Sequence, residues 1–372
     1  MTTPDAVFIG DPNSVFVTRT RDALSLRGIS VVIVSTQHSE TCWPVGRLLN
    51  KIVGMYQRFR HIKNEIKKLP RESTAVVHFL SVDVFWLIPL LKRHFIKVSG
   101  IAYGSDILRR TPSIDWFFAR GLKQLDQIAA TNDNVLNMIL SDFPFMQQTE
   151  HSIVRFGLPV FDAIDEIGKM SPQEARSQLG YDPDKALVSL GYSASLGQRQ
   201  IELITHFTAQ SEYFHHANFV IPIQYGPSAV CNRVIDACEE ANKRSTGPRF
   251  HPLTEFHDAK KAALLRRATT ALINHSVSDA FSGTVQETVY AGSLVLACSQ
   301  LPYETMPGFG TAIQPYSQVS DTISILSEGS IESWTNEIQT SLELVQKELR
   351  NLSSWDAVID DWKFLIASRP SD

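Results

Sequence analysis

The stretch "AVFIGDPNSVFVTRTRDALSLRGISVVIVST" (6–36) decides the fold of this chain. It opens with a short apolar run that ends at a glycine (6–10), and apolar residues then recur at helical spacing until Gly28. A second apolar run follows at 30–36. A buried strand, a helix and another buried strand in this order predict a β-α-β unit with parallel strands.

The same alternation continues along the chain in two series. In the first, further strands are expected at 75–81, 97–104, 127–131 and 152–157. The second series begins with "ALVSLGYS" and has strands expected at 186–193, 218–226, 271–274, 293–297 and 311–314. Such alternation predicts an α/β protein whose parallel sheets are covered by helices on both faces. We therefore expect two Rossmann-like, doubly wound domains that face a cleft, with ligands at the carboxyl ends of the strands.

The turn-rich segment 156–172 separates the two series, and 372 residues suit two domains of ordinary size. We place the N-terminal domain at 1–158 and the C-terminal domain at 159–345. A C-terminal helix at 346–372 is expected to pack back on the first domain. Residues 1–158 carry 19 Lys and Arg against 13 Asp and Glu, whereas the remainder carries 16 against 26. This asymmetry predicts that the two halves meet different partners.

The composition excludes several classes of protein. Hydrophobic residues make up 43% and charged residues 20%, which is typical of a globular protein, and apolar runs such as 84–91 are too short to span a bilayer. The first residues contain no basic segment followed by an apolar run, so we expect no export signal and a cytoplasmic protein. The cysteines are scattered and form no C-x-x-C pair, so we expect neither a disulfide framework nor a metal site; they are Cys42, Cys231, Cys238 and Cys298.

The segment 46–71 holds eight basic residues against one acid, Glu65, and its apolar residues recur at helical spacing. This pattern predicts a basic amphipathic helix. Two interpretations are open: the helix docks on an anionic membrane, as a peripheral protein on its inner face would, or its apolar stripe packs on the first domain and its charges are solvated. Nucleic acid is not an expected partner, because the whole chain has a net charge of −4 and carries no recognised binding motif.

A second stretch, "VSDAFSGTVQETVYAGSLVLAC" (277–298), carries the chemistry. Ser282, Gly283 and Thr284 precede or open a helix, where free backbone N–H groups and the positive end of the helix dipole suit a diphosphate. Glu287 lies one turn further in and can accept two hydrogen bonds from the diol of a ribose. Asp279 can reach hydroxyls of a group beyond the diphosphate. Alternatively, Asp279 caps a turn and Glu287 is an ordinary acid of an amphipathic helix.

The order of this block resembles the motif of GT-B glycosyltransferases of the large E-x7-E group. In that motif an acid, x-Phe-Gly and a second acid are followed by a glycine, and Asp279, Phe281, Glu287 and Gly292 hold those places here. Asp replaces the usual first Glu, the glycine after Phe281 is shifted by one position, and Leu294 stands where Pro is common.

The resemblance extends along most of the chain. "YGSD" (103–106) is similar to the family's H-G-S-D, with Tyr103 in the position of the His, and His78 matches a strand-end His of the first domain. "LGYSASLGQRQIELI" (190–204) resembles the glycine loop that opens the second domain and binds the diphosphate through basic residues; Arg199 is its only basic residue. A looser resemblance is to transferases of TDP-4-acetamido-4,6-dideoxygalactose in lipid-linked glycan synthesis, which implies donor contacts from Ser193, Tyr225 and Gly226.

The resemblance implies a glycosyltransferase of hexosyltransferase type. The enzyme would move a sugar from a nucleotide-diphosphate sugar to a glycan or lipid-linked saccharide in cell-surface polysaccharide or lipopolysaccharide synthesis. Retention of configuration is implied, and neither a metal nor a cofactor beyond the nucleotide sugar is required. Two alternatives stay open: a nucleotide-sugar epimerase of GT-B shape, and a non-catalytic two-lobed sugar-binding protein.

The residues expected at the site fall into three groups. Catalysis is assigned to Asp279, Asp106, Tyr103 and His78. Donor binding is assigned to Glu287, Ser282, Gly283, Thr284, Arg199, Ser193, Tyr225 and Gly226. Acceptor binding is assigned to Gly10, Asp11 and Ser14, in the loop after the first strand. An inverting reaction would need a base at the acceptor, for which Asp11, His78 and Asp106 are candidates.

Overall fold

The structure is a computed structural model that describes residues 3–37, 47–80, 82–108, 110 and 115–367. Cys42 lies outside these residues, as do residue 46 of the segment 46–71, residue 81 of the strand expected at 75–81 and residues 368–372 of the expected C-terminal helix. The chain forms two compact units: unit 1 comprises 1–157 and 355–372, and unit 2 comprises 158–354. The boundary expected at 345/346 falls inside helix α15 (Glu328–Ser353), whose helical pattern continues through that point. Each unit is described by itself.

Unit 1 is built on a sheet of six parallel strands in the order β2-β1-β3-β4-β5-β6. Every residue of β1, β3, β4 and β5 is buried, which is why these strands read as near-continuous apolar runs. The strands are β1 (Ala6–Gly10), β2 (Val31–Ser35), β3 (Thr74–His78), β4 (Lys97–Ala102), β5 (Gln127–Ala130) and β6 (Glu150–Ile153).

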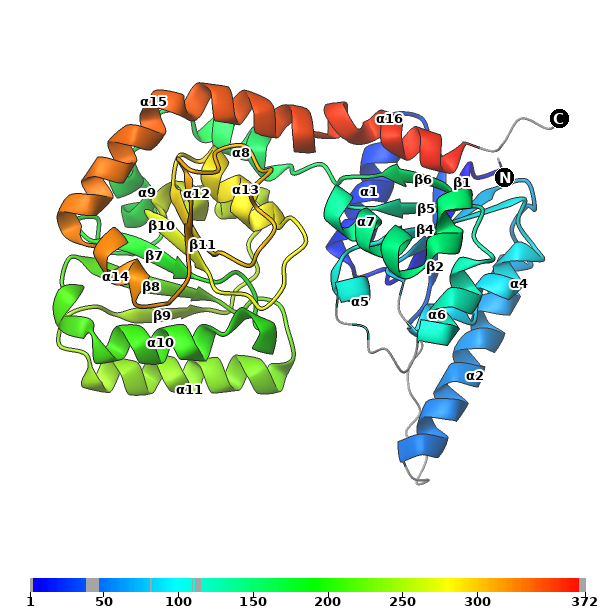
Figure 1. Cartoon of the computed structure of the whole chain (residues 1–372), viewed down its shortest axis with the longest axis horizontal. Coiled ribbons are helices and arrows are strands. Elements are labelled where there is room, and N and C mark those ends of the chain that lie inside the picture. The colour runs from blue at the N-terminus through cyan, green and yellow to red at the C-terminus, as the bar shows by residue number, and fades with distance from the viewer. Residues whose placement is uncertain (1–2, 38–46, 81, 109, 111–114, 368–372) are drawn as a thin grey trace. The chain divides into compact units, whose positions relative to one another are not determined.

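Helices cover this sheet, and the last of them comes from the far end of the chain. They are α1 (Val15–Ser25), α2 (Arg47–Ile66), α3 (Val82–Phe85), α4 (Ile88–Lys92), α5 (Ser105–Leu108), α6 (Asp115–Leu122), α7 (Asp133–Asp142), η2 (Pro144–Gln148) and α16 (Trp355–Ile366). The indole of Trp362 on α16 is buried against Phe8 and His78, and its Nε1 donates to the carbonyl of Arg155 at 2.8 Å. The predicted return of the C-terminal helix to the first domain is confirmed (Figure 1).

Unit 2 has a second sheet of six parallel strands, in the order β12-β11-β10-β7-β8-β9. Its strands are β7 (Ala186–Leu190), β8 (Ala217–Pro222), β9 (Phe250–Leu253), β10 (Ala271–Asn274), β11 (Leu294–Cys298) and β12 (Ile313–Tyr316). The predicted α/β class with two doubly wound parallel sheets is confirmed. Strand β9 was not predicted, because its sequence "FHPL" contains a proline and lies at the sheet edge, where proline is tolerated.

The helices of unit 2 lie on both faces of its sheet. Figure 1 shows α10 and α11 on one face and α8, α12 and α13 on the other. The helical segments are α8 (Val160–Ile167), α9 (Pro172–Gln178), η3 (Leu196–Gln198), α10 (Gln200–Ala209), η4 (Ser211–Tyr213), α11 (Ser228–Arg244), α12 (Ala259–Ala268), α13 (Gly283–Tyr290), α14 (Asp321–Ile325) and α15 (Glu328–Ser353).

The predicted basic amphipathic helix is α2. The C-terminal part of its apolar stripe packs on unit 1, since Ile62 and Ile66 are fully buried, but Tyr56 of the same stripe is 64% exposed. Arg60, Lys63 and Lys67 are also exposed. Among the described residues, no helix combines the length and apolar character needed to cross a membrane. Packing on unit 1 therefore accounts for the C-terminal part of the stripe, and the exposed side of α2 carries basic residues together with Tyr56.

Candidate functional site

The predicted donor-binding residues follow the carboxyl ends of strands in unit 2. From β7 the chain moves outward to β8 and β9, then returns to β10 and moves outward to β11 and β12 on the other side. Strands β7 and β10 are therefore neighbours at the point where the strand order reverses. Ligands of open α/β sheets bind outside the carboxyl ends of the strands at such a point. The loops 191–199 after β7 and 275–282 after β10 carry Ser193, Arg199, Asp279 and Ser282, and α13 follows with Gly283, Thr284 and Glu287.

Two of the site loops are held together by a backbone contact that only glycine permits. The amide of Ala194 donates to the carbonyl of Tyr225 at 2.7 Å. Gly226 follows with φ +132°, and a Cβ at this position would lie 1.8 Å from the carbonyl oxygen of Ala194. Gly226 therefore sets the approach of the loop after β8 to the loop after β7, beside Ser193.

Asp279 joins three parts of unit 2 through one carboxylate. Its Oδ2 accepts hydrogen bonds from Tyr192 Oη at 2.7 Å, Asn274 Nδ2 at 2.8 Å and Tyr303 Oη at 2.5 Å, and its Oδ1 accepts from the amide of Ala280 at 2.8 Å. Burial, together with the nearby Asp279 carboxylate, raises the pKa of Tyr192 and of Tyr303 well above the usual range, so both remain donors. This environment suits a residue that fixes the loop after β10; its predicted catalytic role stays a prediction.

Helix α13 starts where the sequence predicted, with Ser282 as N-cap and Gly283 and Thr284 in its first turn. A Cβ on Gly283 would lie 2.9 Å from Cδ2 of Leu158, so the glycine allows this close packing. One turn further, Glu287 is buried, and its Oε2 accepts from Nε of Arg266 on α12 at 3.2 Å. Nη2 of Arg266 also lies 3.3 Å from Oγ1 of Thr284, so one guanidinium bridges the two predicted donor-binding side chains.

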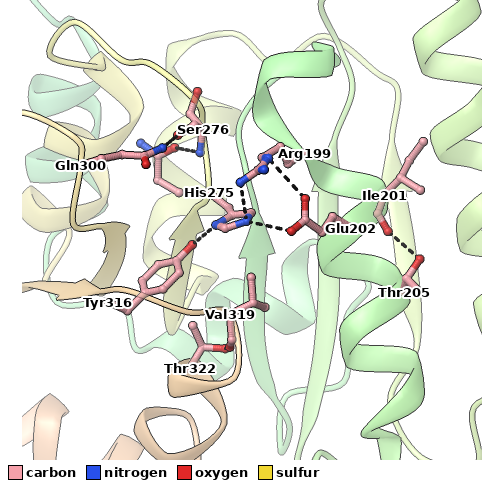
Figure 2. Close-up of polar contacts among 11 residues, drawn as sticks. Arg199, Ile201, Glu202, Thr205, His275, Ser276, Gln300, Tyr316, Val319 and Thr322 are labelled. Atoms are coloured by element: carbon pink, nitrogen blue, oxygen red, sulfur yellow. Dashed lines mark hydrogen bonds and ion pairs between the residues drawn. The ribbon is translucent and has the colours of Figure 1, made fainter.

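Arg199, the N-cap of α10, lies at the centre of a second polar cluster (Figure 2). Its Nη1 lies 3.2 Å from Nε2 of His275, and its Nε lies 3.3 Å from Oε2 of Glu202. His275 directly follows β10, is buried, and places its Nδ1 2.8 Å from Oη of Tyr316 at the end of β12. Arg199 is thus held at the edge where β7, β10 and β12 end, with part of its side chain exposed.

Strained backbone conformations occur in loops that follow the carboxyl ends of strands in both sheets. Among the described residues, the non-glycine residues with positive φ are Phe79 at 64°, Arg199 at 52° and Phe281 at 73°. Phe79 follows β3, Arg199 lies between β7 and α10, and Phe281 lies between β10 and α13. Such conformations cost about 1–3 kcal/mol each and persist where the surrounding structure imposes them, which is often at functional sites.

In unit 1 the predicted His78 and Tyr103 are in contact. Nδ1 of His78 lies 2.6 Å from Oη of Tyr103, and Nε2 has no hydrogen-bond partner among the described residues. Burial lowers the pKa of His78 to about 3, so the imidazole is neutral at physiological pH. Rings of Phe16, Phe79 and Phe156 pack around Tyr103.

Asp106 is buried, and its carboxylate accepts hydrogen bonds from backbone amides. It accepts from the N–H groups of Leu80 at 2.8 Å, Tyr103 at 3.0 Å and Gly104 at 2.8 Å, and from that of Ile107 at 3.1 Å. Burial raises the pKa of Asp106, while these amides act in the opposite direction. The carboxylate therefore ties the loop after β3 to the loop after β4, which suits a positioning role.

The predicted acceptor-binding residues lie at the end of β1, beside β3 in the sheet. A Cβ on Gly10 would lie 3.2 Å from Cβ of His78, so the glycine lets the two strand ends approach. Asp11 is half-buried, and its carboxylate accepts from the amide of Asn13 at 2.8 Å and from Nε2 of Gln37 at 2.7 Å. Ser14 is the N-cap of α1, and its side chain makes no capping bond.

Several residues of this region were missed from sequence. Tyr192 lies within the quoted stretch 190–204 and His275 directly follows the strand expected at 271–274, but nothing local shows that their side chains point into the clusters. Glu202 reads as an ordinary acid one turn into α10. Phe256, whose exposed ring lies 5.7 Å from that of Tyr225, follows the unpredicted strand β9. No group of three or more His, Cys, Asp or Glu side chains within the described ranges is arranged to hold a metal ion.

Comparison with solved structures finds this architecture in nucleotide-sugar enzymes at low identity. A UDP-forming α,α-trehalose-phosphate synthase from Burkholderia xenovorans matches with a TM-score of 0.74 and 10% identity, over 99% of this chain and 100% of that one. A sucrose-phosphate synthase from Thermosynechococcus elongatus matches with a TM-score of 0.69 and 14% identity, over 98% of each chain. An E. coli trehalose-6-phosphate protein bound with UDP-2-fluoro glucose matches with a TM-score of 0.68 and 11% identity, over 98% of this chain and 100% of that one.

These matches define the class of fold. The chain has the fold of the GT-B glycosyltransferases, as its motif predicted. No protein-family model and no curated protein matches the sequence. At 10–14% identity the likeness concerns the fold, and the function is argued from the site itself.

Proposed function

We propose that the protein is a glycosyltransferase of hexosyltransferase type that moves a sugar from a nucleotide-diphosphate sugar to a saccharide acceptor. The observation that carries the proposal is that three predicted donor-binding elements follow strands that meet at the β7–β10 switch point of unit 2. Arg199, the start of α13 and the buried Glu287 follow these strand ends, and together they match a diphosphate with an adjacent ribose. The same fold in enzymes that form sugar phosphates from nucleotide sugars supports it.

In this proposal the donor is held by charge-assisted hydrogen bonds. Backbone N–H groups of Gly283 and Thr284 and the guanidinium of Arg199 stabilise the departing diphosphate. The carboxylate of Glu287 accepts hydrogen bonds from both hydroxyls of the ribose, and Arg266 orients that carboxylate. Tyr225 and Phe256 offer exposed rings on the same edge, next to Gly226.

Retention of configuration is proposed, because two of the three residues assigned to an inverting base, Asp106 and His78, have environments unsuited to that role. Asp106 is committed to four backbone amides, and His78 is buried with a strongly lowered pKa. Asp11, half-buried at the end of β1, is the candidate base if the reaction inverts. The proposal routes no step through a metal.

The direct test is turnover of a panel of UDP-, TDP-, GDP- and ADP-sugars with saccharide and lipid-linked saccharide acceptors. We expect one donor to release nucleoside diphosphate in amounts equal to the glycosylated product. Conversion of the donor to another nucleotide sugar without an acceptor would identify an epimerase instead. Binding without any conversion would identify a sugar-binding protein.

The acceptor proposed is a lipid-linked saccharide of cell-surface polysaccharide synthesis, reached at an anionic membrane from the cytoplasmic side. The exposed basic residues Arg60, Lys63 and Lys67 of α2 support this docking, each contributing about 1 kcal/mol near such a surface. Ile62 and Ile66 are buried in unit 1, so in this proposal the charges of α2 make the main contribution to the contact. Docking should therefore weaken steeply with salt.

Vesicle sedimentation tests this part of the proposal. Reversal of Arg60, Lys63 and Lys67 to Glu should abolish sedimentation with vesicles of phosphatidylglycerol and phosphatidylcholine. Reversal of Arg233, Lys243 and Arg244 on α11, exposed in the same way in unit 2, is the matched control. Equal sedimentation of both variants would remove α2 as the docking surface.

A further inference from the structure

The imidazole of His275 contacts two side chains that require opposite protonation states of its Nε2 atom. Its Nε2 lies 3.2 Å from Nη1 of Arg199 and 3.3 Å from Oε1 of Glu202, while its Nδ1 lies 2.8 Å from Oη of Tyr316. Figure 2 shows Arg199 and Glu202 converging on one side of the ring and Tyr316 on the other. The three partners come from α10 and β12, and His275 itself follows β10.

The chemistry of these groups decides the proton position in each charge state. A guanidinium can only donate, so the contact with Arg199 requires a free lone pair on Nε2. The proton of the neutral ring then lies on Nδ1 and is donated to Tyr316. A carboxylate can only accept, so the contact with Glu202 requires a proton on Nε2. Neutral His275 therefore binds Arg199, and protonated His275 binds Glu202 and repels Arg199.

The surrounding charges favour the neutral form at physiological pH. Burial is the largest influence and lowers the pKa of His275; Glu202 raises it, and Arg199 lowers it further. The other titratable groups nearby are Tyr316, whose pKa is raised chiefly by burial, Cys298 beside that tyrosine, and His206 on α10. Neither Tyr316 nor His206 adds a negative charge near neutral pH that would favour the imidazolium.

We propose that neutral His275 is a positioning residue, which holds the guanidinium of Arg199 ready for the donor diphosphate, and that protonation of His275 releases it. This inference rests on the proposed function. Arg199 needs such support because its long side chain is 40% exposed and would otherwise lose rotamer freedom on binding. With Nη1 bound to His275 and Nε paired with Glu202, the remaining N–H groups of the guanidinium are free to meet phosphate oxygens in a fixed geometry.

The backbone supports the same interpretation. Arg199 has φ 52° and ψ 30°, a left-handed conformation that is unfavourable for a residue with a side chain. It also begins α10, and its carbonyl accepts the amide of Leu203 at 3.2 Å. The loop thus fixes the Cα of Arg199, and His275 and Glu202 fix the end of its side chain.

The test is the affinity for UDP and for TDP, measured by calorimetry between pH 8 and pH 5. The variants are Arg199→Ala, His275→Phe and His275→Gln, with His206→Gln as a matched control on the neighbouring helix face. At pH 8 we expect His275→Phe to weaken nucleotide affinity about tenfold. The affinity of His275→Gln should stay within about threefold of the wild type, because its amide oxygen can accept a hydrogen bond from Arg199. At pH 5 the wild type and His206→Gln should lose about tenfold more affinity than His275→Gln. Protonation of the phosphate is common to all of them and cancels in that comparison.

The outcomes separate the inference from the proposed function. If Arg199→Ala binds as tightly as the wild type, Arg199 has no donor role and the donor site is placed wrongly. If Arg199→Ala weakens binding but His275→Phe does not, the positioning role is overturned. Glu202→Gln, at an exposed helix position, keeps the test decisive if the His275 variants do not fold. This substitution removes the charge that raises the pKa of His275, so the fall in nucleotide affinity on acidification should occur at a lower pH than in the wild type. If the fall occurs at the same pH in both proteins, the inference is contradicted.

Discussion

Replacement of Asp279 by alanine distinguishes a positioning role from a catalytic one. Oδ2 of Asp279 accepts from Tyr192, Asn274 and Tyr303, and all three donors are left without this acceptor in the variant. Hydrogen bonds to charged groups are worth about 1.5–3 kcal/mol each. Water can replace part of this loss, since Asp279 is half-exposed, so we expect the free energy of unfolding of unit 2 to fall by about 3–4 kcal/mol.

Scanning calorimetry gives the assay. For a unit of this size about 1 kcal/mol corresponds to roughly 2–4 °C, so the transition should fall by about 6–16 °C. Asp279→Asn, which keeps one carbonyl oxygen for the three donors, should fall by less than half as much. Asp236→Ala, an exposed acid on α11, is the control and should leave the transition unchanged. A normal transition in Asp279→Ala combined with complete loss of turnover would refute the positioning argument and restore a catalytic role.

Three further predictions concern other loops of the site. Gly226→Ala should abolish nucleotide binding and destabilise unit 2, since its Cβ would overlap the carbonyl of Ala194; near-normal binding of UDP and TDP would show that the loop moves freely. Phe79→Gly relieves the strain of φ 64° but removes a ring that packs on Tyr103, so the free energy of unfolding of unit 1 in urea should change by no more than about 1 kcal/mol; a larger loss would show that the strain is small. His78→Gln should flatten the acid loss of stability: the pKa of His78 is lowered to about 3, so its stabilising contribution is complete above about pH 6.5 and declines as pH falls, by about 2 kcal/mol at pH 5. If the free energy of unfolding of the wild type and that of His78→Gln fall in parallel from pH 7 to pH 5, burial of His78 does not have this effect.

The fold was largely predictable because it depends on local periodicity. The run 6–10, the helical spacing to Gly28 and the run 30–36 became β1, α1 and β2, and the same pattern located every strand except β9. Strand β9 was missed because a four-residue edge strand with a proline has no periodic signal. In α2, periodicity predicted the amphipathic helix. Whether its apolar residues pack on the protein or contact a membrane depends on residues of unit 1 that are distant in sequence.

The candidate site was predictable only where one short stretch carries it. Ser282, Gly283 and Glu287 belong to one helix start, so their order in sequence is also their order in space. The partners that define Asp279 come from Tyr192 and Tyr303, and those of Arg199 include His275, 76 residues away. Such contacts follow from strand order, because neighbouring strands at the switch point are distant in sequence. Likewise, the sequence marks Gly226 as a turn, but only the packed sheet brings Ala194 against it.

The central claim is that unit 2 binds a nucleoside diphosphate through Glu287 and the start of α13. Calorimetric titration of UDP, TDP, GDP and ADP into the wild type and Glu287→Ala tests it most directly, with Glu239→Ala, an exposed acid on α11, as control. We predict that one nucleotide binds clearly and that Glu287→Ala loses about tenfold to a hundredfold in affinity, as expected for a lost charged hydrogen-bond partner. Equal affinity of Glu287→Ala and the wild type, or no binding of any of the four nucleotides, would contradict the claim.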